Sequence, residues 1–202
     1  MDPLSQGIVG SVAAQQKSSK EKILLITIIG FLSGMAPDLD VFIRSSHDPL
    51  LAIEFHRQFT HSLIFIPFGG FICGTFFYHV LTKRKGMSIK ETYLYCTLAY
   101  ASHGILDACT SYGTQLFWPF NDFRVAWNTI SIVDPIFTIT LFTLVFLSIF
   151  RRKTIFARIA LIWVITYMSI GLIQHNRAEK VGLLNADSRG HIPARIVVKP
   201  SL

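Results

Sequence analysis

Apolar residues gather in five long segments of the chain, and short polar stretches separate them. A helix needs about 20 predominantly apolar residues to cross the hydrocarbon core of a bilayer. The five segments reach or approach this length, and they cover residues 23–43, 62–81, 93–108, 130–150 and 155–173. The pattern predicts an all-α protein, a polytopic membrane bundle of about five transmembrane helices.

Two parts of the chain fit this pattern less well. The third segment is short and is interrupted by polar residues around His103, as expected of a helix that lines a polar cavity. Near the N-terminus, residues 7–14 are apolar but too few to span, and no basic region of a signal peptide precedes them. We expect a short helix here that dips into the membrane and turns back at Lys17, carrying Asp2 and Gln6 toward the far face.

Composition agrees with a membrane protein and excludes an ordinary cytosolic domain. Of the 202 residues, 51% are hydrophobic and only 15% are charged, with 17 phenylalanines and a mean hydropathy of +0.47. Soluble domains carry about 25% charged residues. No internal repeat, low-complexity tract or linker divides the sequence. We therefore expect residues 1–202 to form a single membrane-embedded domain.

The distribution of basic residues predicts the orientation in the membrane. The net charge is +7, but the basic residues cluster at the ends of the apolar segments, so topology explains them and no nucleic-acid partner is expected. Ten of them precede the first segment or lie in the second and fourth connections: Lys17, Lys20, Lys22, Lys83, Arg84, Lys85, Lys90, Arg151, Arg152 and Lys153. The opposite loops contain only Arg44, Arg57 and Arg124, although the C-terminal tail on that side adds five more. We expect the group of ten to face the cytoplasm.

Six ionisable side chains lie in or beside the apolar segments, where a charged group is costly and by default indicates function. They are Asp38, Asp40, His56, His61, His103 and Asp107. Because successive spans alternate in direction, all six emerge on one side of the membrane, which is the extracytoplasmic face in the orientation above. Imidazole and carboxylate donors together suit zinc, manganese or iron better than calcium or copper. We predict that the six hold a divalent metal, with zinc as the first choice.

Local spacing supports this interpretation. His103 and Asp107 are four residues apart, so they lie on one face of a helix. Pro37 marks a bend, and Asp38 and Asp40 project in the same direction if the backbone there is extended. A single histidine near an apolar segment is usually a packing residue, and an aspartate at a helix end can cap the helix or face water. Those alternatives require a separate partner for each buried group.

Asp134 and the pair His175 and Asn176 reach the same face by the same alternation. They are candidates for supporting partners or additional ligands. Asp134 before Pro135 is also typical of a helix start, with Asp as the N-cap and Pro at the first helical position, and we prefer that interpretation.

Three motifs, MAPDLDVF, FHRQFTHSLIF and SHGILDACTSYGTQLFWPF, occur in this order. They resemble the bacterial inner-membrane metal-dependent hydrolase family that includes the LexA-binding YdjM-like proteins, and the resemblance covers most of the chain. It implies a multi-pass protein of the bacterial cytoplasmic (inner) membrane. Carried over residue by residue, the family's acidic pair falls on Asp38 and Asp40, its paired histidines on His56 and His61, and its His-x-x-x-Asp element on His103 and Asp107.

One position departs from the resemblance. Many relatives place a histidine where this chain has Gln6, and glutamine is a poor zinc ligand, so the departure bears on the number of metals. The family as a whole is distantly similar to zinc-dependent phospholipase C and P1-type nucleases. By analogy, this similarity implies phosphoester hydrolysis.

Together these residues predict a membrane-bound metal-dependent hydrolase. A bound divalent ion lowers the pKa of its water and polarises a phosphoryl or acyl oxygen. Asp38 or Asp40 is the candidate general base, and Arg57 is a candidate for holding a substrate anion, with an ordinary surface charge as the equal alternative. A site at the membrane surface favours membrane lipids as partners and a phosphoester or lipid-linked substrate.

Two other classes of function fit parts of the sequence. In a non-catalytic membrane regulator or scaffold, the metal would hold the bundle together and the basic cytoplasmic loops would bind a soluble regulatory partner. A hydrolase should tolerate changes in residues 83–90 but lose activity with His103→Ala, and a regulator should show the reverse. A transporter ranks last, because it needs polar residues in both halves of the membrane.

Overall fold

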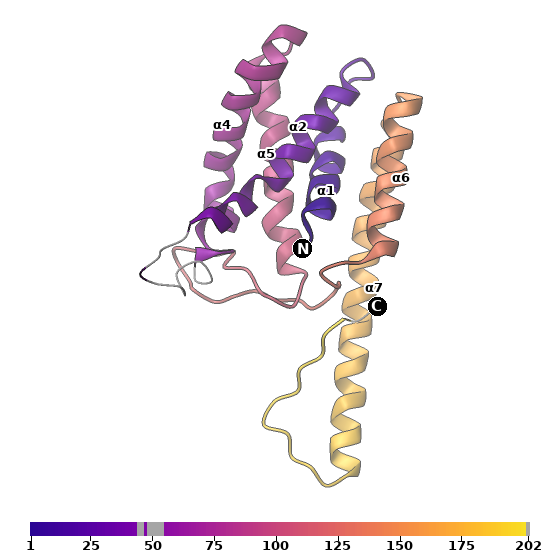
Figure 1. Ribbon diagram of the computed structural model, residues 1–202. Helices are drawn as coiled ribbons and strands as arrows, with labels where there is room; N and C mark the ends of the chain where they lie inside the picture. Colours follow the sequence, from indigo (N-terminus) through magenta and orange to yellow (C-terminus); the bar gives the residue numbers. More distant parts are fainter. Residues whose placement is uncertain (44–46, 48–54, 201–202) are drawn as a thin grey trace.

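The computed structural model describes residues 1–43, 47 and 55–200, so Arg44 of the predicted topology lies outside the described residues. Regular structure in these ranges is helical, and an isolated bridge joins Thr114 to Val125. The prediction of an all-α helical bundle is confirmed (Figure 1). The main helices are α1 (Pro3–Gln15), α2 (Ile23–Met35), α4 (Ile66–Phe77), α5 (Ile89–Ala108), α6 (Pro135–Arg151) and α7 (Ile155–Ser188).

Three helical stretches of the described chain are long and apolar enough to cross a membrane. They are Ile23–Phe42, Leu63–Lys85 and Ile155–Ser188. The apolar helix α6 is shorter, with 17 residues. Helix α5 has 20 residues and packs against α1, α2 and α4, and its polar residues Thr92, His103 and Asp107 are buried in the protein. The count of five spans therefore stays a prediction.

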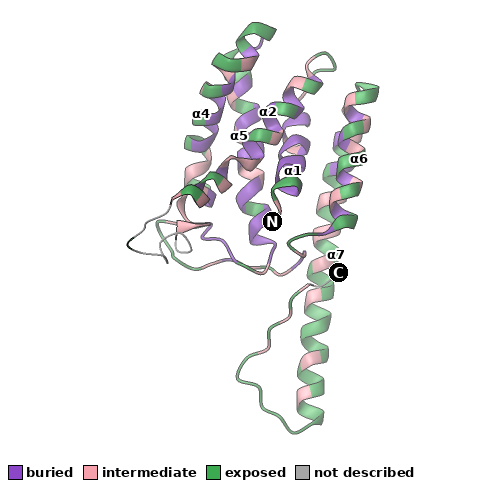
Figure 2. Cartoon of the chain, in the orientation of Figure 1, coloured by how far each residue is buried: buried purple, intermediate pink, exposed green. Residues whose placement is uncertain are grey.

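Helix α1 lies at the centre of the bundle, between α2 and α5 on one side and α6 and α7 on the other. It begins with Asp2 as the N-cap, whose carboxylate accepts a hydrogen bond from the Ser5 backbone at 2.9 Å, and with Pro3 in its first turn. Ten of its 13 residues are buried, and Figure 2 shows it as the purple centre of the bundle. The chain then turns back after Gln15, as predicted near Lys17.

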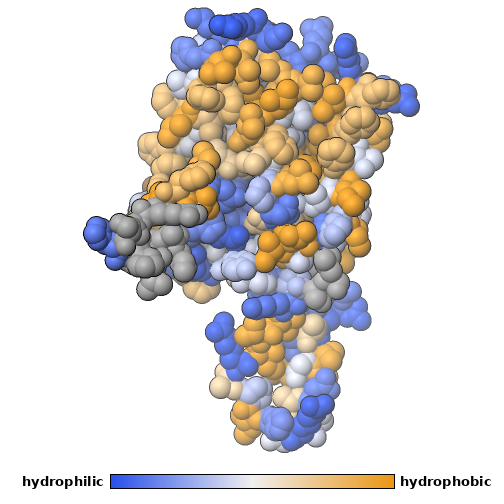
Figure 3. Space-filling model, in the orientation of Figure 1, coloured by the Kyte–Doolittle hydropathy of each residue, from blue (hydrophilic) through white to orange (hydrophobic). Residues whose placement is uncertain are grey.

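The two ends of the bundle differ in polarity. The connections between α1 and α2, between α4 and α5, and between α6 and α7 all lie at one end (Figure 1). These connections and the adjoining helix ends hold the ten basic residues described above. A band of hydrophobic residues separates this end from the polar level at which α5 ends (Figure 3). The structure thus has the charge asymmetry on which the predicted topology rests.

Candidate metal centre

The six residues predicted from the sequence lie at the end of the bundle opposite the basic connections. Asp38 and Asp40 come from the 3-10 helix η1 (Ala36–Phe42), which continues α2. His61 ends the 3-10 helix η2 (Phe59–His61), and His103 and Asp107 lie in the last turns of α5. The side chains form two groups that share Asp38, and within each group the donor atoms lie within 4.8 Å of one another: Asp38, His61, His103 and Asp107; and Asp38, Asp40 and His56.

In the first group, two imidazole nitrogens and two carboxylate oxygens converge. Nε2 of His61 and Nε2 of His103 are 3.0 Å apart, and they lie 3.4 and 3.3 Å from Oδ1 of Asp38. Oδ2 of Asp107 lies 3.5 and 3.8 Å from the same two nitrogens. In a tetrahedral zinc site, with ligands about 2.0–2.2 Å from the metal, the ligand atoms are about 3.3–3.6 Å apart. The spacing therefore fits one metal ion.

Both histidine rings are held by their other nitrogen. Nδ1 of His103 lies 2.5 Å from the carbonyl oxygen of Gly34, and because a carbonyl only accepts, Nδ1 carries the proton. Nδ1 of His61 lies 2.9 Å from the Thr60 hydroxyl, which gives its own proton to Oδ2 of Asp40 at 2.8 Å and therefore accepts the proton of Nδ1. Oδ2 of Asp40 itself lies 3.3 Å from Nδ1. In the neutral form of each ring, Nε2 would then have a lone pair directed at the cluster. Metal-binding histidines in proteins are usually oriented in this way.

Asp40 supports the cluster from outside. Its Oδ1 lies 2.8 Å from Nδ1 of His56, and its Oδ2 accepts hydrogen bonds from the Arg57 backbone at 3.1 Å and from the Thr60 hydroxyl at 2.8 Å. The backbone here is a 3-10 helix and not the extended chain considered above. Oδ1 of Asp38 lies 3.4 Å from Nε2 of the His61 ring, and Oδ2 of Asp40 lies 3.3 Å from its Nδ1.

Asp107 has one satisfied and one unsatisfied oxygen. Oδ1 accepts a hydrogen bond from the Gln6 amide at 2.8 Å and contacts the α-amino group of Met1. Oδ2 is buried, and among the described residues none donates it a hydrogen bond, although Nε of Arg57 lies 3.2 Å away. A buried carboxylate oxygen without a donor is costly, and a cation at the cluster would satisfy it. Within the described chain, Oδ2 of Asp107 thus has no hydrogen bond despite its contact with Arg57, which leaves it available as a metal ligand.

Arg57 belongs to the same site, and its burial excludes the alternative that it is an ordinary surface charge. It is only 8% exposed, its guanidinium donates to the Thr110 hydroxyl at 3.3 Å, and it lies over the ring of Tyr112. Its backbone has a φ of 64°, which is uncommon for a residue other than glycine. Such strain costs about 1–3 kcal/mol and is concentrated at functional sites.

The pKa of His61 also supports a cation at the cluster. Burial opposes protonation of the ring, but the neighbouring carboxylates of Asp107, Asp38 and Asp40 outweigh it and raise the pKa of His61 to about 10. The carboxylates thus create a strongly negative environment around this ring. A divalent cation can take the place of the proton in such an environment.

The remaining candidates lie elsewhere. Asp134 caps α6 by accepting a hydrogen bond from the Phe137 backbone at 3.0 Å, and it also accepts one from the Tyr167 hydroxyl at 2.7 Å. The interpretation of Asp134 as a helix cap is therefore confirmed. His175 and Asn176 lie on α7, and neither joins the clusters found among the described residues. Sequence reasoning missed Thr60 and the Gly34 carbonyl, because a hydroxyl beside a histidine and a backbone oxygen carry no distinctive signal.

The fold and the site together define a helical membrane protein with a buried histidine–aspartate cluster that can hold a metal ion. The chain belongs to the YdjM inner membrane protein family, whose family model matches residues 1–178. It is also similar to the inner membrane protein YbcI of Escherichia coli (strain K12), with 25% identity over 154 residues that cover 73% of this chain and 82% of that protein. No solved structure matches the chain. The family resemblance and the inner-membrane location expected from the sequence are thus confirmed.

Proposed function

We propose that this protein is a membrane-embedded hydrolase that cleaves a phosphoester with a metal-activated water molecule. The observation that carries the proposal is the convergence of His61, His103, Asp38 and Asp107 on one point beside a large cavity. Structural zinc sites are closed by their ligands, whereas catalytic sites keep one position open. Asp38 is 22% exposed and lines the cavity, so the cluster has an accessible side, which favours catalysis over a purely structural ion.

In the proposed centre, the two Nε2 atoms and Asp107 would hold the ion and Asp38 would lie at the fourth, accessible position, and we favour zinc because of the tetrahedral spacing. When bound, the ion supplies a hydroxide near neutral pH and withdraws charge from a phosphoryl oxygen. Asp40 is a positioning residue, because its carboxylate lies beside Nδ1 of His61 and orients the Thr60 hydroxyl that accepts the Nδ1 proton. Asp38 is the preferred general base, since it is the carboxylate of the cluster that faces the cavity.

Arg57 completes the proposed centre as the anion-binding group. Its side chain lines the cavity and lies beside Asp107, and a guanidinium offers a planar pair of donors that matches two oxygens of a phosphate. We place this centre on the extracytoplasmic side of the inner membrane. The support is the distribution of basic residues, which gather at the opposite end of the bundle.

Metal content is the first test of the proposal. Detergent-purified protein should contain stoichiometric zinc, and His61→Ala and His103→Ala should lose it because each removes one converging nitrogen. The exposed His191 lies outside the cluster, so His191→Ala should retain the metal. A wild-type protein that stays metal-free, after purification without chelators and after reloading with zinc, manganese and iron, would overturn the proposal.

Hydrolysis is the second test. The metal-loaded protein should cleave bis-p-nitrophenyl phosphate, and His103→Ala should lower the rate to background. A variant with Lys83, Arg84 and Lys85 all changed to Ala should keep the rate, since these residues lie at the opposite end of the bundle. A metal-loaded protein without activity on phosphomonoesters, phosphodiesters and phospholipids would instead favour a regulator. Loss of function in the triple variant but not in His103→Ala would also favour a regulator.

A further inference from the structure

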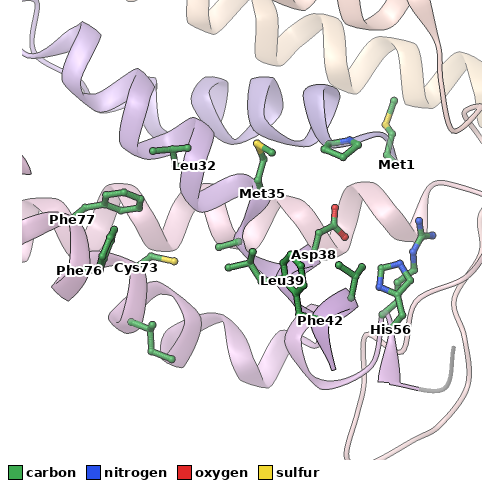
Figure 4. Close-up of a pocket in the computed structure, with 15 residues that line it drawn as sticks. Met1, Leu32, Met35, Asp38, Leu39, Phe42, His56, Cys73, Phe76 and Phe77 are labelled. Atoms are coloured by element: carbon green, nitrogen blue, oxygen red, sulfur yellow. The ribbon is translucent and has the colours of Figure 1, made fainter. Parts of the chain in front are cut away.

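A cavity of about 850 Å³, partly open to the outside of the bundle, begins beside the proposed centre. One end is polar and is formed by Asp38, His56 and Arg57. The other end is formed by Phe76 and Phe77 of α4, and Figure 4 shows these two rings at the opposite side of the pocket from His56. The cavity therefore has a reactive head and an apolar body.

The body of the cavity is lined by α2 and η1 on one side and by α4 on the other. Leu32, Met35 and Leu39 come from the first wall, and Ile72 and Cys73 come from the second (Figure 4). Both walls belong to the stretches Ile23–Phe42 and Leu63–Lys85, which are long and apolar enough to span a membrane. The body of the cavity is thus lined by two candidate membrane-spanning segments.

The volume and the chemistry of the cavity indicate which kind of ligand it binds. Its volume lies within the range of about 300–1,000 Å³ that is usual for small-molecule sites. A water-soluble phosphoester would fill only the polar end and would leave the apolar walls of α2 and α4 in contact with water, which is unfavourable.

We infer that the cavity binds one hydrocarbon chain of a phosphate-bearing membrane lipid and places the lipid phosphate between Arg57 and the His61–His103 cluster. This inference rests on the proposed function, and it names the substrate class of that site. The apolar walls fit the hydrocarbon chain of the lipid, and the positive guanidinium of Arg57 complements the negative phosphate. Because lipid tails are as apolar as leucine, the phosphate contact and not hydrophobicity distinguishes this position from the surrounding bilayer.

Photolabelling tests the inference without requiring turnover. The probe is a phosphatidylglycerol with a diazirine near the end of one acyl chain, added to metal-loaded protein in lipid nanodiscs. Mass spectrometry should find labels on cavity residues such as Leu32 and Ile72. Unlabelled phosphatidylglycerol should compete for these labels, and Arg57→Gln should lower them at least fivefold. A diazirine-bearing alkane without a phosphate should not label the cavity above the lipid-exposed surface.

Two neighbouring residues of α4 provide a matched pair of variants. Ile72 lines the cavity and Phe71 does not, yet they are 60% and 62% exposed, so a tryptophan fits at either position without disturbing the core. Ile72→Trp should reduce cavity labelling about tenfold or more, and Phe71→Trp should leave it unchanged. Both variants should retain their zinc, which shows that the centre is intact.

Three results would overturn the inference. They are uniform labelling of the outer helix faces, equal cavity labelling by the alkane, and a second protein chain crosslinked inside the cavity. Because labelling does not depend on hydrolysis, failure of the proposed function shows separately, as a labelled cavity in a protein that cleaves no phosphoester.

Discussion

At the scale of single residues, Asp40 helps to orient the His61 ring toward the cluster. The carboxylate is fixed by the Arg57 backbone and the Thr60 hydroxyl, and it lies beside Nδ1 of His61. A negative charge at this position favours the tautomer with a free Nε2 and makes that nitrogen more basic. Asp40 would therefore act on a bound metal through another residue.

Asp40→Asn tests this arrangement, because the carboxamide keeps the shape of the side chain and removes its charge. We expect the affinity for zinc to fall about 10–100-fold, the usual effect of losing such a partner. Competition with a fluorescent chelator measures it. Asp134→Asn is the matched control, since Asp134 caps α6 away from the cluster. Unchanged affinity in Asp40→Asn, or an equal loss in the control, would contradict the assignment.

At the scale of helices, α1 fits against α2 because glycines remove the side chains between them. A Cβ atom on Gly10 would lie 2.6 Å from the carbonyl oxygen of Gly30 and 2.8 Å from Cα of Gly34. Gly34 also supplies the carbonyl that holds His103, and α1 carries Gln6, which binds Asp107. Close packing of these two helices therefore sets the positions of groups that touch the centre.

Gly10→Ala should separate α1 from α2, because the contacting atoms are backbone and cannot rotate away. Overpacking of this kind costs about 1–3 kcal/mol. We expect a lower thermal transition in detergent together with weaker zinc binding. Gly182→Ala is the control, because its Cβ would lie 3.6 Å from the nearest atom, and it should lower neither quantity. A destabilised Gly10→Ala protein with full zinc affinity would show that helix packing does not position the centre.

At the scale of the whole molecule, the centre and the basic connections lie at opposite ends of the bundle (Figure 1). Positively charged loops are retained in the cytoplasm, so this arrangement predicts on which side the centre works. Residues exposed at the two ends can report the orientation directly. Lys85 lies at the basic end, and Asp122 lies in the connection that follows α5 at the other end.

Cysteine labelling in intact cells tests the orientation, in a background without the three native cysteines. Asp122→Cys should react with a membrane-impermeant maleimide added from outside the cytoplasmic membrane. Lys85→Cys should react only after the membrane has been permeabilised. The opposite pattern would place the centre in the cytoplasm and would leave the geometry of the site unchanged.

Much of the site could be predicted from the sequence, because alternation of spans and the four-residue spacing of His103 and Asp107 depend only on regular helix geometry. The 3-10 turn that separates Asp38 from Asp40 could not, since it depends on how α2 ends against its neighbours. The central position of α1 could not be predicted from the sequence either. The hydropathy of α1 is low because other helices surround it, and polar residues such as Gln6 and Gln15 are fully buried among them.

The hydrogen bond between Gln6 and Asp107 joins residues that are 101 positions apart. During synthesis, the first helix therefore emerges long before the residues that complete its contacts, and it is too short and too polar to rest in the bilayer alone. A nascent chain that ends before Asp107 also lacks one of the four converging donors. If the cluster holds an ion as proposed, all four donors would therefore be present only after α5 has been made.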